Sequence, residues 1–593
     1  MTAQQPTGAA YPFPATEPVT PEKQQKSSRG RWIVALLATV LVVGAAAALV
    51  MVAGRGAGAT GAPSYLPAGT VAYVETRLDL PGDQREKVAD FLAHFPGFAD
   101  RAALELKIDD TLDRLVREGT DGEYTYTGDL KPWFGGQVSI GVIEAPEIDA
   151  QAMEENPEVP IVGVVSVTDR EAAAAVLERI RTDAEREGVT VTSEDHGGVT
   201  IYTIPASEGS TEAARYALTE DALLFAMREG DLEAALDRKA SGTDTLAGSA
   251  EFTASQNGLR GDRVATFYFD TATLRELTEA GLEDLGPASD FMRQQLENYP
   301  TSLVSTVHVD SDRLVGEVRM TLPADAERPV PAESTITSRV PATSNVYLEM
   351  VDVGKGIGTL VEQLKQAPEA EEMSAELEQV EGILGSDLED YLDWLDDLAF
   401  AGQLEGDTPT GALVGSVTDQ ETGESRLRQL SALLTLAGAQ MGGGVAVDRE
   451  DYNGTEITTI AVEVPEEIAE GAEDLPIAAG DLEISYAFES GFFMLGLGDE
   501  QVKELIDLEP ADSLGSSDRF RGALQAAGGP VTSGISYLDL ASLRGFAEEL
   551  VPPDERTRYD QEIEPYVEPL DLLIGTTVQE GETFVSRLHF IVK

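Results

Sequence analysis

Cysteine is absent from this sequence of 593 residues, so histidine, serine and the acidic residues are the side chains that could do chemistry. The absence excludes thiol nucleophiles, disulfides, iron–sulfur clusters and cysteine-ligated zinc. No HExxH motif and no closely spaced pair of histidines occurs, which leaves a zinc ion almost no ligands. We therefore predict no metal site and a structural role for each histidine, namely His94, His196, His308 and His589.

Motifs for nucleophilic catalysis and phosphate binding are also missing. The sequence contains no GxSxG elbow, no SxxK pair and no P-loop. Residues 511–514 resemble the start of a GDSL-type hydrolase, but alanine replaces its glycine and no DxxH motif follows. Residues 56–61 match the letters of the dinucleotide fingerprint GxGxxG, yet they follow a long apolar segment instead of a strand. The sequence therefore predicts no catalytic residue and no cofactor-binding residue.

The 106 acidic residues leave carboxylate catalysis open. Glycosidases use two acids that flank the scissile bond, but among so many acids the sequence selects no pair. Asp390, Asp393 and Asp397 share one face of a predicted helix, opposite leucines, and we interpret them as a solvated face. Residues 310–312 (DSD) begin like a calcium loop, but Leu314 stands at the third ligand position.

The composition gives 42 basic against 106 acidic residues and a formal charge of -64. A field of that sign repels phosphates, so we expect no nucleic-acid partner. A hydrophobic fraction of 42% is typical of a folded protein, and the length predicts two or more domains.

Residues 32–53 contain no charge and no proline, and as a helix they would measure about 33 Å, enough to cross a bilayer. Four basic residues stand at positions 23–31, whereas only Arg55 follows the segment closely. The positive-inside rule therefore predicts a single-pass plasma-membrane protein with residues 1–31 as a disordered cytoplasmic tail and the bulk of the chain extracytoplasmic. A cleaved signal peptide is the alternative, because Ala57-Gly58-Ala59 has the form of a cleavage site.

The rest of the chain contains an internal repeat. LPAGTVAYVE recurs as VPATSNVYLE, VVSVTD as VGSVTD, VTSEDHGGVTIYTI as VDREDYNGTEITTI and ATFYFDTATLREL as SGISYLDLASLRGF. WFGGQVSIG at 133–141 recurs loosely as AFAGQLEGD at 399–407. Because the matches keep their order, we predict two copies of one domain. The predicted boundaries are 54–65 for a first linker, 66–325 for repeat 1, 326–337 for a second linker and 338–593 for repeat 2.

Each copy is predicted to contain strands and helices. Segments such as AYVETRL alternate apolar and polar residues, which is typical of half-buried strands, and residues 171–186 have helical spacing. Gly197-Gly198 and Asn453-Gly454 favour tight hairpin turns. Asp270 and Asp539 follow strands and precede helices, where aspartate caps the first turn. We predict an α+β fold: an N-terminal transmembrane helix, then two tandem antiparallel-sheet domains with helices packed mainly on one side.

LPAGTVAYVE, DLPGDQREKVADFLAHFPGFAD and DLKPWFGGQVSIGV, which follow the apolar segment, carry a resemblance. They resemble bacterial, actinobacterial-type single-pass membrane proteins with a duplicated extracytoplasmic domain of unknown function. The resemblance covers residues 64–593 and implies an extracytoplasmic location, but no activity and no catalytic residues. Lys131, Pro132 and Trp133 are expected in one copy only, because we match DLA at 397–399 to them in the second.

Three functions remain compatible with the sequence. The absence of a catalytic set favours a non-catalytic binding or scaffolding protein of the cell envelope, with a protein or lipid ligand. An envelope carrier of lipid or another hydrophobic ligand is the first alternative, because paired strands can line an apolar cup. A carboxylate-dependent hydrolase is the second.

Overall fold

A computed structural model of the protein describes residues 61–593, apart from 99, 121, 145–159, 187, 206–212, 276–298, 324–329, 367–376, 378–380, 383, 405–409, 442–444 and 465–479. The predicted cytoplasmic tail and the predicted transmembrane helix, 32–53, lie outside the described residues. Among the described residues, no helix combines the length and the apolar character that crossing a bilayer requires.

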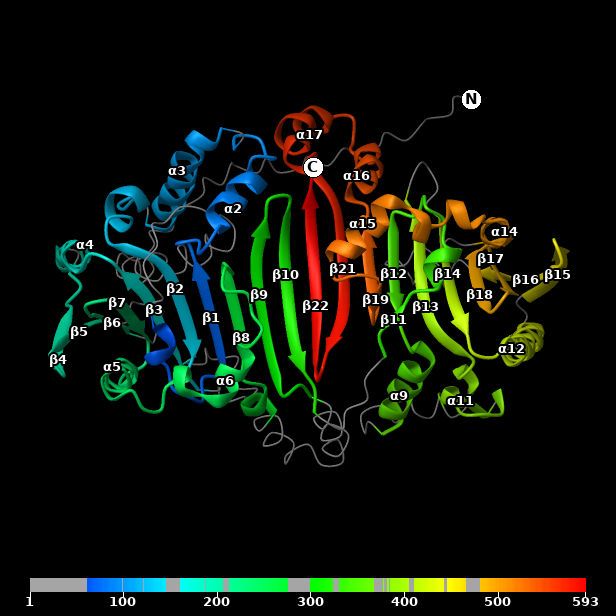
Figure 1. Ribbon diagram of the computed structural model, residues 1–593, viewed down its shortest axis with the longest axis horizontal. Helices are drawn as coiled ribbons and strands as arrows, with labels where there is room; N and C mark the ends of the chain where they lie inside the picture. The colour runs from blue at the N-terminus through cyan, green and yellow to red at the C-terminus, as the bar shows by residue number, and fades with distance from the viewer. Residues whose placement is uncertain are drawn as a thin grey trace, which may run out of the picture.

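Twenty strands form one sheet in which every neighbouring pair is antiparallel (Figure 1). The first half of the sheet runs, in spatial order, through β4 (Thr192–His196), β5 (Val199–Ile204), β6 (Ala214–Leu218), β7 (Ala222–Ala226), β3 (Ile161–Val167), β2 (Phe134–Val142), β1 (Ala72–Arg77), β8 (Ala265–Phe269), β9 (Ser302–Asp310) and β10 (Arg313–Thr321).

The second half continues from β10 to the other end of the sheet. Its order is β22 (Thr583–Val592), β21 (Leu570–Glu580), β20 (Gly534–Leu538), β12 (Val346–Met350), β13 (Leu395–Gln403), β14 (Thr410–Val417), β18 (Phe492–Leu497), β17 (Gly480–Glu489), β16 (Thr455–Val464) and β15 (Val445–Tyr452). If the strands are counted from each edge of the sheet toward its centre, the two halves show the same spatial order relative to the order of their strands along the chain. A strand in one half therefore has a counterpart in the other.

The predicted separation into two tandem domains is wrong, because β10 pairs with β22 over nine residue pairs, from Arg313–Ile591 to Thr321–Thr583. Figure 1 shows these two strands side by side at the centre of the molecule. A continuous backbone ladder leaves no boundary between two sheets. We call this β10–β22 junction the seam. The residue boundaries 66–325, 326–337 and 338–593 stay a prediction.

The predicted one-sided arrangement of helices is also wrong, because helices cover both faces. On one face, Tyr73 of β1 shares a core with Leu232 of α5. Residue 141 of β2 lies beside Tyr73, so Val138, three residues away on β2, points to the opposite face. Val138 packs there with Ile108 of α3. Strands with apolar residues on both faces need cover on both.

Thirteen helices are named in the described residues, and they connect the strands. Their bounds are α2 (Gln84–Leu92), α3 (Arg101–Gly119), α4 (Arg170–Arg186), α5 (Asp231–Ser241), α6 (Ala250–Ser255), α9 (Val353–Gln366), α11 (Leu388–Leu392), α12 (Gln420–Met441), α14 (Asp499–Ile506), α15 (Asp518–Ala526), α16 (Leu540–Glu549), α17 (Arg556–Glu562) and α18 (Glu564–Val567).

The helix predicted around Asp390, Asp393 and Asp397 is only partly correct. Helix α11 ends at Leu392 and strand β13 begins at Leu395, so the three aspartates do not share a helix face. Burial raises the pKa of the Asp397 carboxyl, which is not a fully solvated group. The interpretation as one solvated face is therefore wrong for Asp397.

The loose match of residues 133–141 to 399–407 is displaced. Tyr73 lies beside residue 141, whereas its counterpart Tyr347 lies beside Ala401. The backbone carbonyls of Trp133 and Trp394 each accept a hydrogen bond of 2.8 Å, from Thr168 and Thr418 respectively. Both halves thus contain a tryptophan at this place, and the expectation that Trp133 has no equivalent is wrong.

Several local predictions are confirmed. Residues 170–186 form α4. The turns at Gly197-Gly198 and Asn453-Gly454 have positive φ at all four residues and close the β4–β5 and β15–β16 hairpins. Strands β4 and β15 are the two edges of the sheet, and their exposed acidic side chains are Glu194, Asp195, Asp448, Glu450 and Asp451.

Candidate functional site

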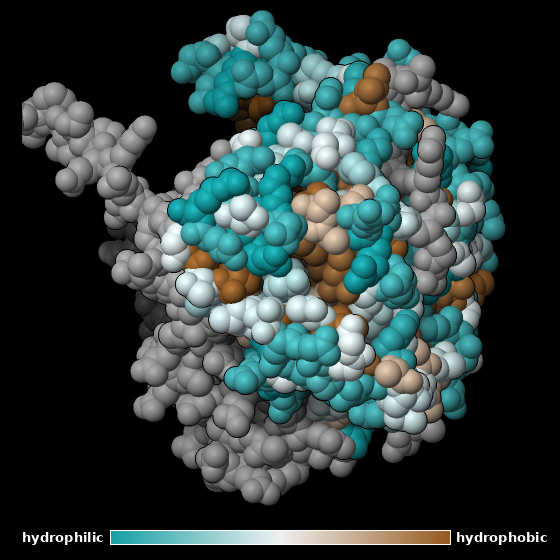
Figure 2. Space-filling model, turned by 90° about the vertical axis from the view of Figure 1, so that its left-hand side faces the viewer, coloured by the Kyte–Doolittle hydropathy of each residue, from teal (hydrophilic) through white to brown (hydrophobic). Residues whose placement is uncertain are grey.

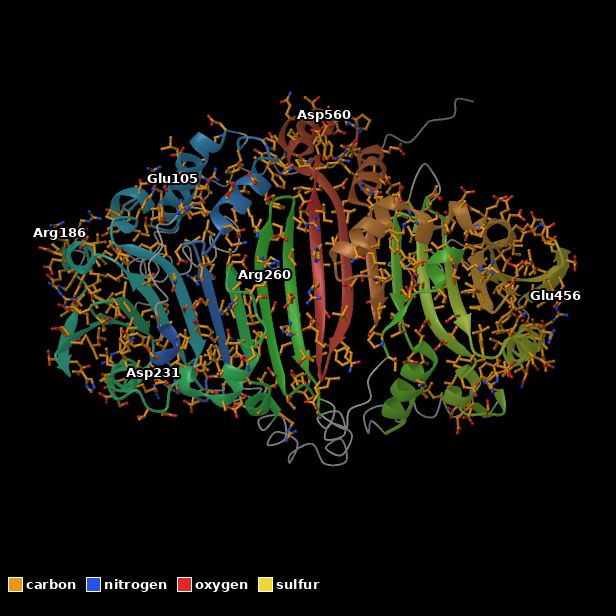
Figure 3. The ribbon with its side chains drawn as sticks, in the orientation of Figure 1. Glu105, Arg186, Asp231, Arg260, Glu456 and Asp560 are labelled. Atoms are coloured by element: carbon orange, nitrogen blue, oxygen red, sulfur yellow. The ribbon has the colours of Figure 1, made fainter. Side chains whose placement is uncertain are left out.

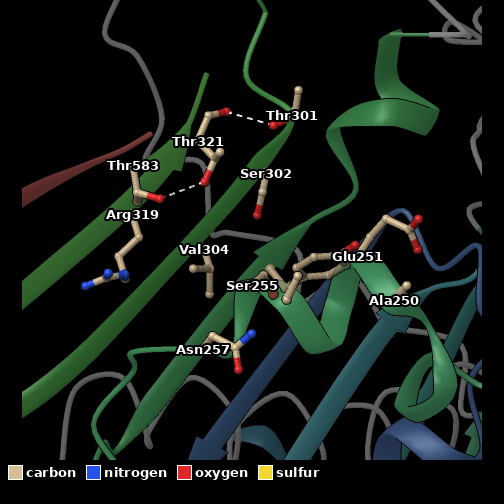
Figure 4. Close-up of a pocket in the computed structure, with 12 residues that line it drawn as sticks. Ala250, Glu251, Ser255, Asn257, Thr301, Ser302, Val304, Arg319, Thr321 and Thr583 are labelled. Atoms are coloured by element: carbon tan, nitrogen blue, oxygen red, sulfur yellow. Dashed lines mark hydrogen bonds between the residues drawn. The ribbon is translucent and has the colours of Figure 1, made fainter. Parts of the chain in front are cut away.

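A pocket of about 370 Å³ opens beside the seam. One side of α6 lines it, together with residues of β8, β9 and β10, and β22 contributes Thr583 (Figure 4). We call it the central pocket. Because the strands on either side of the seam take part, neither half forms it alone.

Helix α6 is held in place by its first turn and by one aromatic side chain. The Ser249 hydroxyl accepts a hydrogen bond of 3.2 Å from the Phe252 backbone N–H, which caps the helix. The Phe252 ring packs edge-on against Tyr73 and Tyr268, with ring centroids 5.7 and 5.1 Å apart. These contacts fix the helix wall of the pocket relative to the sheet.

Arg319 provides the positive charge of the central pocket, and it is fully compensated. Its guanidinium donates to Glu317 at 3.2 Å and to Glu580 at 2.8 Å. Arg587 donates to the same two carboxylates, at 2.8 and 3.1 Å. Burial by itself would raise the pKa of the Glu580 carboxyl, but the bonds from the two arginines lower it below its usual value. The network of two cations and two anions is neutral and crosses the seam.

Tyr268 of β8 is only 2% exposed, yet it lines the pocket. Its hydroxyl makes no hydrogen bond with any residue that the structure describes. Burial raises the pKa of this phenol, so it stays protonated at neutral pH. A hydroxyl that faces a pocket without a protein partner is free to bond water or a ligand.

Hydroxyl groups, the Asn257 amide and the Glu251 carboxylate form the rest of the polar lining. Thr301 donates to the backbone carbonyl of Thr321 at 3.2 Å, and the hydroxyls of Thr321 and Thr583 lie 3.1 Å apart, as the dashed lines in Figure 4 show. The side chains of Ser302 and Asn257 also line the pocket. Among the described residues of the lining there is no histidine, lysine or cysteine.

The family now follows from comparison with known proteins. The family described as "Protein of unknown function (DUF3352)" matches residues 33–555. The chain belongs to the DUF3352 family. Among curated proteins no sequence matches this chain. A solved structure titled "Structure of crystal form I of TP0453" is 9% identical, with 45% of this DUF3352 chain and 80% of that chain covered and a TM-score of 0.23. A TM-score this low supports no inference about fold or function.

The histidines of this DUF3352 protein do not converge. His94 Nδ1 lies 3.1 Å from the Phe91 carbonyl, and the exposed His196 pairs with Asp237 at 2.8 Å. His308 and His589 are each 5% exposed and flank Val315 in adjacent strands at the centre of the sheet. Within the described residues, no group of three or more histidine and acidic side chains is arranged to hold a metal ion.

The two predicted capping aspartates are confirmed. Asp270 accepts from the backbone N–H groups of Ala272 and Thr273, at 3.1 and 3.2 Å. Asp539 accepts from that of Ser542 at 3.1 Å. In the calcium-like segment, Asp310 pairs with Lys87 and Asp312 with Arg313, so these carboxylates serve ion pairs.

The groups with carboxylate chemistry are buried or dispersed. Glu349 accepts from the Tyr347 hydroxyl at 2.8 Å, and burial raises the pKa of its carboxyl. It is 6% exposed, which denies access to a substrate. Ser513 of the GDSL-like segment is 3% exposed and donates to the Pro510 carbonyl. Figure 3 shows the labelled acidic residues Glu105, Glu456 and Asp560 in widely separated parts of the molecule.

Proposed function

We propose that this DUF3352 protein is a non-catalytic binding protein of the cell envelope and that its central pocket holds a neutral, hydroxyl-rich ligand of the carbohydrate class. The observation that carries the proposal is Tyr268, whose ring is buried in the pocket wall and whose hydroxyl makes no hydrogen bond with any described residue. Ligand hydroxyls both donate and accept, as the phenol, the threonine hydroxyls and the Asn257 amide require.

The charge arrangement of the pocket, which includes the Glu251 carboxylate, disfavours an anionic ligand. Arg319 already has two carboxylate partners, so an anionic ligand would have to displace Glu317 or Glu580. Neither displacement is favourable, since each would leave a carboxylate of the seam without one of its bonds. The net charge of -64 adds a long-range repulsion against anions. The mixed polar lining gives no support to a carrier of hydrophobic ligands.

The location belongs to the same proposal. Residues 32–53 would anchor the chain, with the sheet on the outer side of the plasma membrane, because basic residues precede the apolar segment. A phosphatase that works only outside the cytoplasm, fused after residue 593, should be active in whole cells. An inactive but full-length fusion would contradict this topology.

Binding can be tested by calorimetric titration of the full-length chain with two trisaccharides, neutral chitotriose and anionic trigalacturonate. We expect the neutral sugar to bind at least about tenfold more tightly. Ala254→Trp places an indole in the pocket and should abolish binding. Ala240→Trp is the matched control, because Ala240 is exposed on α5 away from the pocket. Equal binding by both variants, or preference for the anionic sugar, would contradict the proposal.

A further inference from the structure

A second pocket of about 370 Å³ lies near the opposite end of the first half, between α4 and strands β5 and β6. Figure 2 views this end of the molecule, where hydrophilic residues surround small apolar areas. From α4 the pocket takes Arg170, Ala174, Leu177, Glu178 and Arg181, which follow one another at helical spacing. The stripe from Arg170 to Arg181 covers twelve residues, and the eleven steps between its ends rise about 16 Å along the helix axis. The pocket is therefore an elongated groove, which we call the α4 groove.

Tyr216 of β6 forms the floor of the α4 groove and is 2% exposed. Its hydroxyl has no hydrogen-bond partner among the residues that the structure describes. Leu177, 7% exposed, lies beside it on the helix side. The groove thus combines an apolar floor with a hydroxyl that has no hydrogen-bond partner among the described residues.

The counterpart of Tyr216 in the second half is closed. In the first half, Tyr216 of β6 pairs with Phe225 of β7, which pairs in turn with Gly163 of β3. In the second half, Tyr486 of β17 pairs with Leu495 of β18, which pairs in turn with Leu413 of β14. The two tyrosines therefore occupy the same place in their halves.

Tyr486, however, has a partner on the helix above it. The hydroxyls of Tyr486 and Ser431 lie 3.2 Å apart, and Ser431 of α12 is 1% exposed. The second half thus fills this place with a satisfied core contact.

The difference comes from one helix position. Asp169 caps α4 and Asp419 caps α12, through bonds of 2.9 and 3.1 Å to the third residue on. Twelve residues after these caps stand Arg181 and Ser431, since 169 + 12 = 181 and 419 + 12 = 431. The Arg181 guanidinium lies over the Tyr202 ring, 4.9 Å from its centroid, instead of closing over Tyr216.

The lining indicates what fits. The Tyr202 ring contacts Arg181, whose guanidinium lies 4.9 Å from the ring centroid, and it stacks with Tyr216 at 5.1 Å and 18°. This aromatic pair is thus already engaged in contacts within the protein. Charges of both signs stand along the rim, with Arg170 near Glu220 at 3.7 Å and Arg181 bonded to Glu178.

We propose that the α4 groove binds an extended peptide of about five residues, a length that matches 16 Å at about 3.3 Å per residue. The Tyr216 and Thr200 hydroxyls bond the backbone amides of the peptide. Small apolar side chains lie against Leu177 and Leu218, and the rim charges select charged side chains of either sign. This site is separate from the central pocket and does not depend on its ligand.

The experiment begins with selection of a random heptapeptide phage library on the full-length chain. An enriched sequence is then synthesised and titrated by fluorescence anisotropy. Ala174→Trp fills the groove and should weaken binding more than about tenfold. Ala175→Trp is the matched control, because Ala175 is the next residue of α4, is exposed and does not line the groove, and it should bind as the parent does.

The tyrosine pair separates a binding role from a structural one. Tyr216→Phe removes a hydroxyl without a protein partner, so it should weaken peptide binding about threefold to tenfold and leave the melting temperature unchanged. Tyr486→Phe should lower the melting temperature and leave peptide binding unchanged. The proposal is overturned if no peptide is enriched, if Ala174→Trp binds like the parent, or if chitotriose binding is lost in Ala174→Trp and kept in Ala254→Trp.

Discussion

Glu75 and Glu349 occupy the same place in the two halves of the sheet, and each accepts a hydrogen bond from a buried tyrosine two residues earlier, at 2.7 and 2.8 Å. Their strand neighbours differ. Ser139 and Thr266 flank Glu75, whereas Ala399 and Ile535 flank Glu349.

The positive charge also differs. Arg263 interacts electrostatically with Glu75. Burial lowers the pKa of the Arg263 guanidinium, and the negative charge of Glu75 opposes that shift. Burial raises the pKa of Glu349, and the negative charge of Asp397 adds to the effect. The first half therefore places polar neighbours around its glutamate where the second half places apolar ones, which teaches that one strand order can hold a carboxylate in two different environments.

The largest expected effect lies at the seam, where the counterparts Glu317 and Arg587 meet. Glu317→Arg would place like charges against Arg587 and Arg319, and we expect it to lower the free energy of unfolding by about 3–5 kcal/mol. Urea denaturation checks this. Glu317→Arg combined with Arg587→Glu should recover most of the loss. A double variant no more stable than the single one would show that charge pairing does not join the halves.

Acid should destabilise the centre of the sheet. Burial lowers the pKa of His308, and it lowers that of His589 from 6.5 to about 4. The folded protein resists protonation of these histidines. Their contribution to the free energy of unfolding is therefore constant above about pH 6.5 and falls as the pH approaches 4, by about 3 kcal/mol for His589.

Val315 of β10 lies directly opposite His589 in the seam, so valine is an apolar residue that already packs at this depth of the sheet and is the test substitution. His589→Val should flatten the dependence of the unfolding free energy on pH between 6.5 and 4. An unchanged slope would contradict a neutral, buried His589.

Glu349 should respond to pH in the opposite sense. Its folded pKa is raised, so stability is greatest at low pH and falls as the pH rises through the folded value. Glu349→Gln should therefore stabilise the protein at pH 8 by about 1 kcal/mol and leave it unchanged at pH 4. Glu75→Gln is the matched control and should not stabilise at pH 8, since it removes a charge that Arg263 compensates.

The smallest effect distinguishes the two floor tyrosines. Tyr486→Phe should cost about 1 kcal/mol because it leaves the buried Ser431 hydroxyl without this partner. Tyr216→Phe should change the free energy of unfolding by less than about 0.3 kcal/mol, because no protein bond is lost. Thermal unfolding of both variants at one pH provides the comparison. Equal losses would indicate that Tyr216 has a structural partner.

Local structure was predictable wherever a few adjacent residues determine it. The α4 spacing, the Asn453-Gly454 turn and the Asp270 cap each depend on contacts within one or two turns of chain. The helix predicted around Trp394 was partly wrong because the leucines there have helical spacing. In the structure the Trp394 indole packs against Phe488 and Phe493, and a strand begins at Leu395.

The seam and both pockets could not be predicted for a different reason. Strand alternation indicates which face a residue takes but not which distant strand is its neighbour, and β10 meets a strand more than 260 residues later in the chain. Arg319 and Thr583 belong to no motif, and they share a pocket only through that pairing. The importance of Tyr268 and Tyr216 depends on which partners are missing around a hydroxyl, and no residue pattern records that.

The sheet ends in two open margins, β4 and β15, whose unpaired backbone groups could be extended by another molecule. Both margins carry exposed carboxylates of one sign, so two molecules meeting end to end repel each other. Ionisation of these carboxylates thus restrains growth into fibrils. Neutralising those carboxylates in strong acid, or screening them in concentrated salt, removes the restraint while the ladder donors and acceptors remain ready to pair.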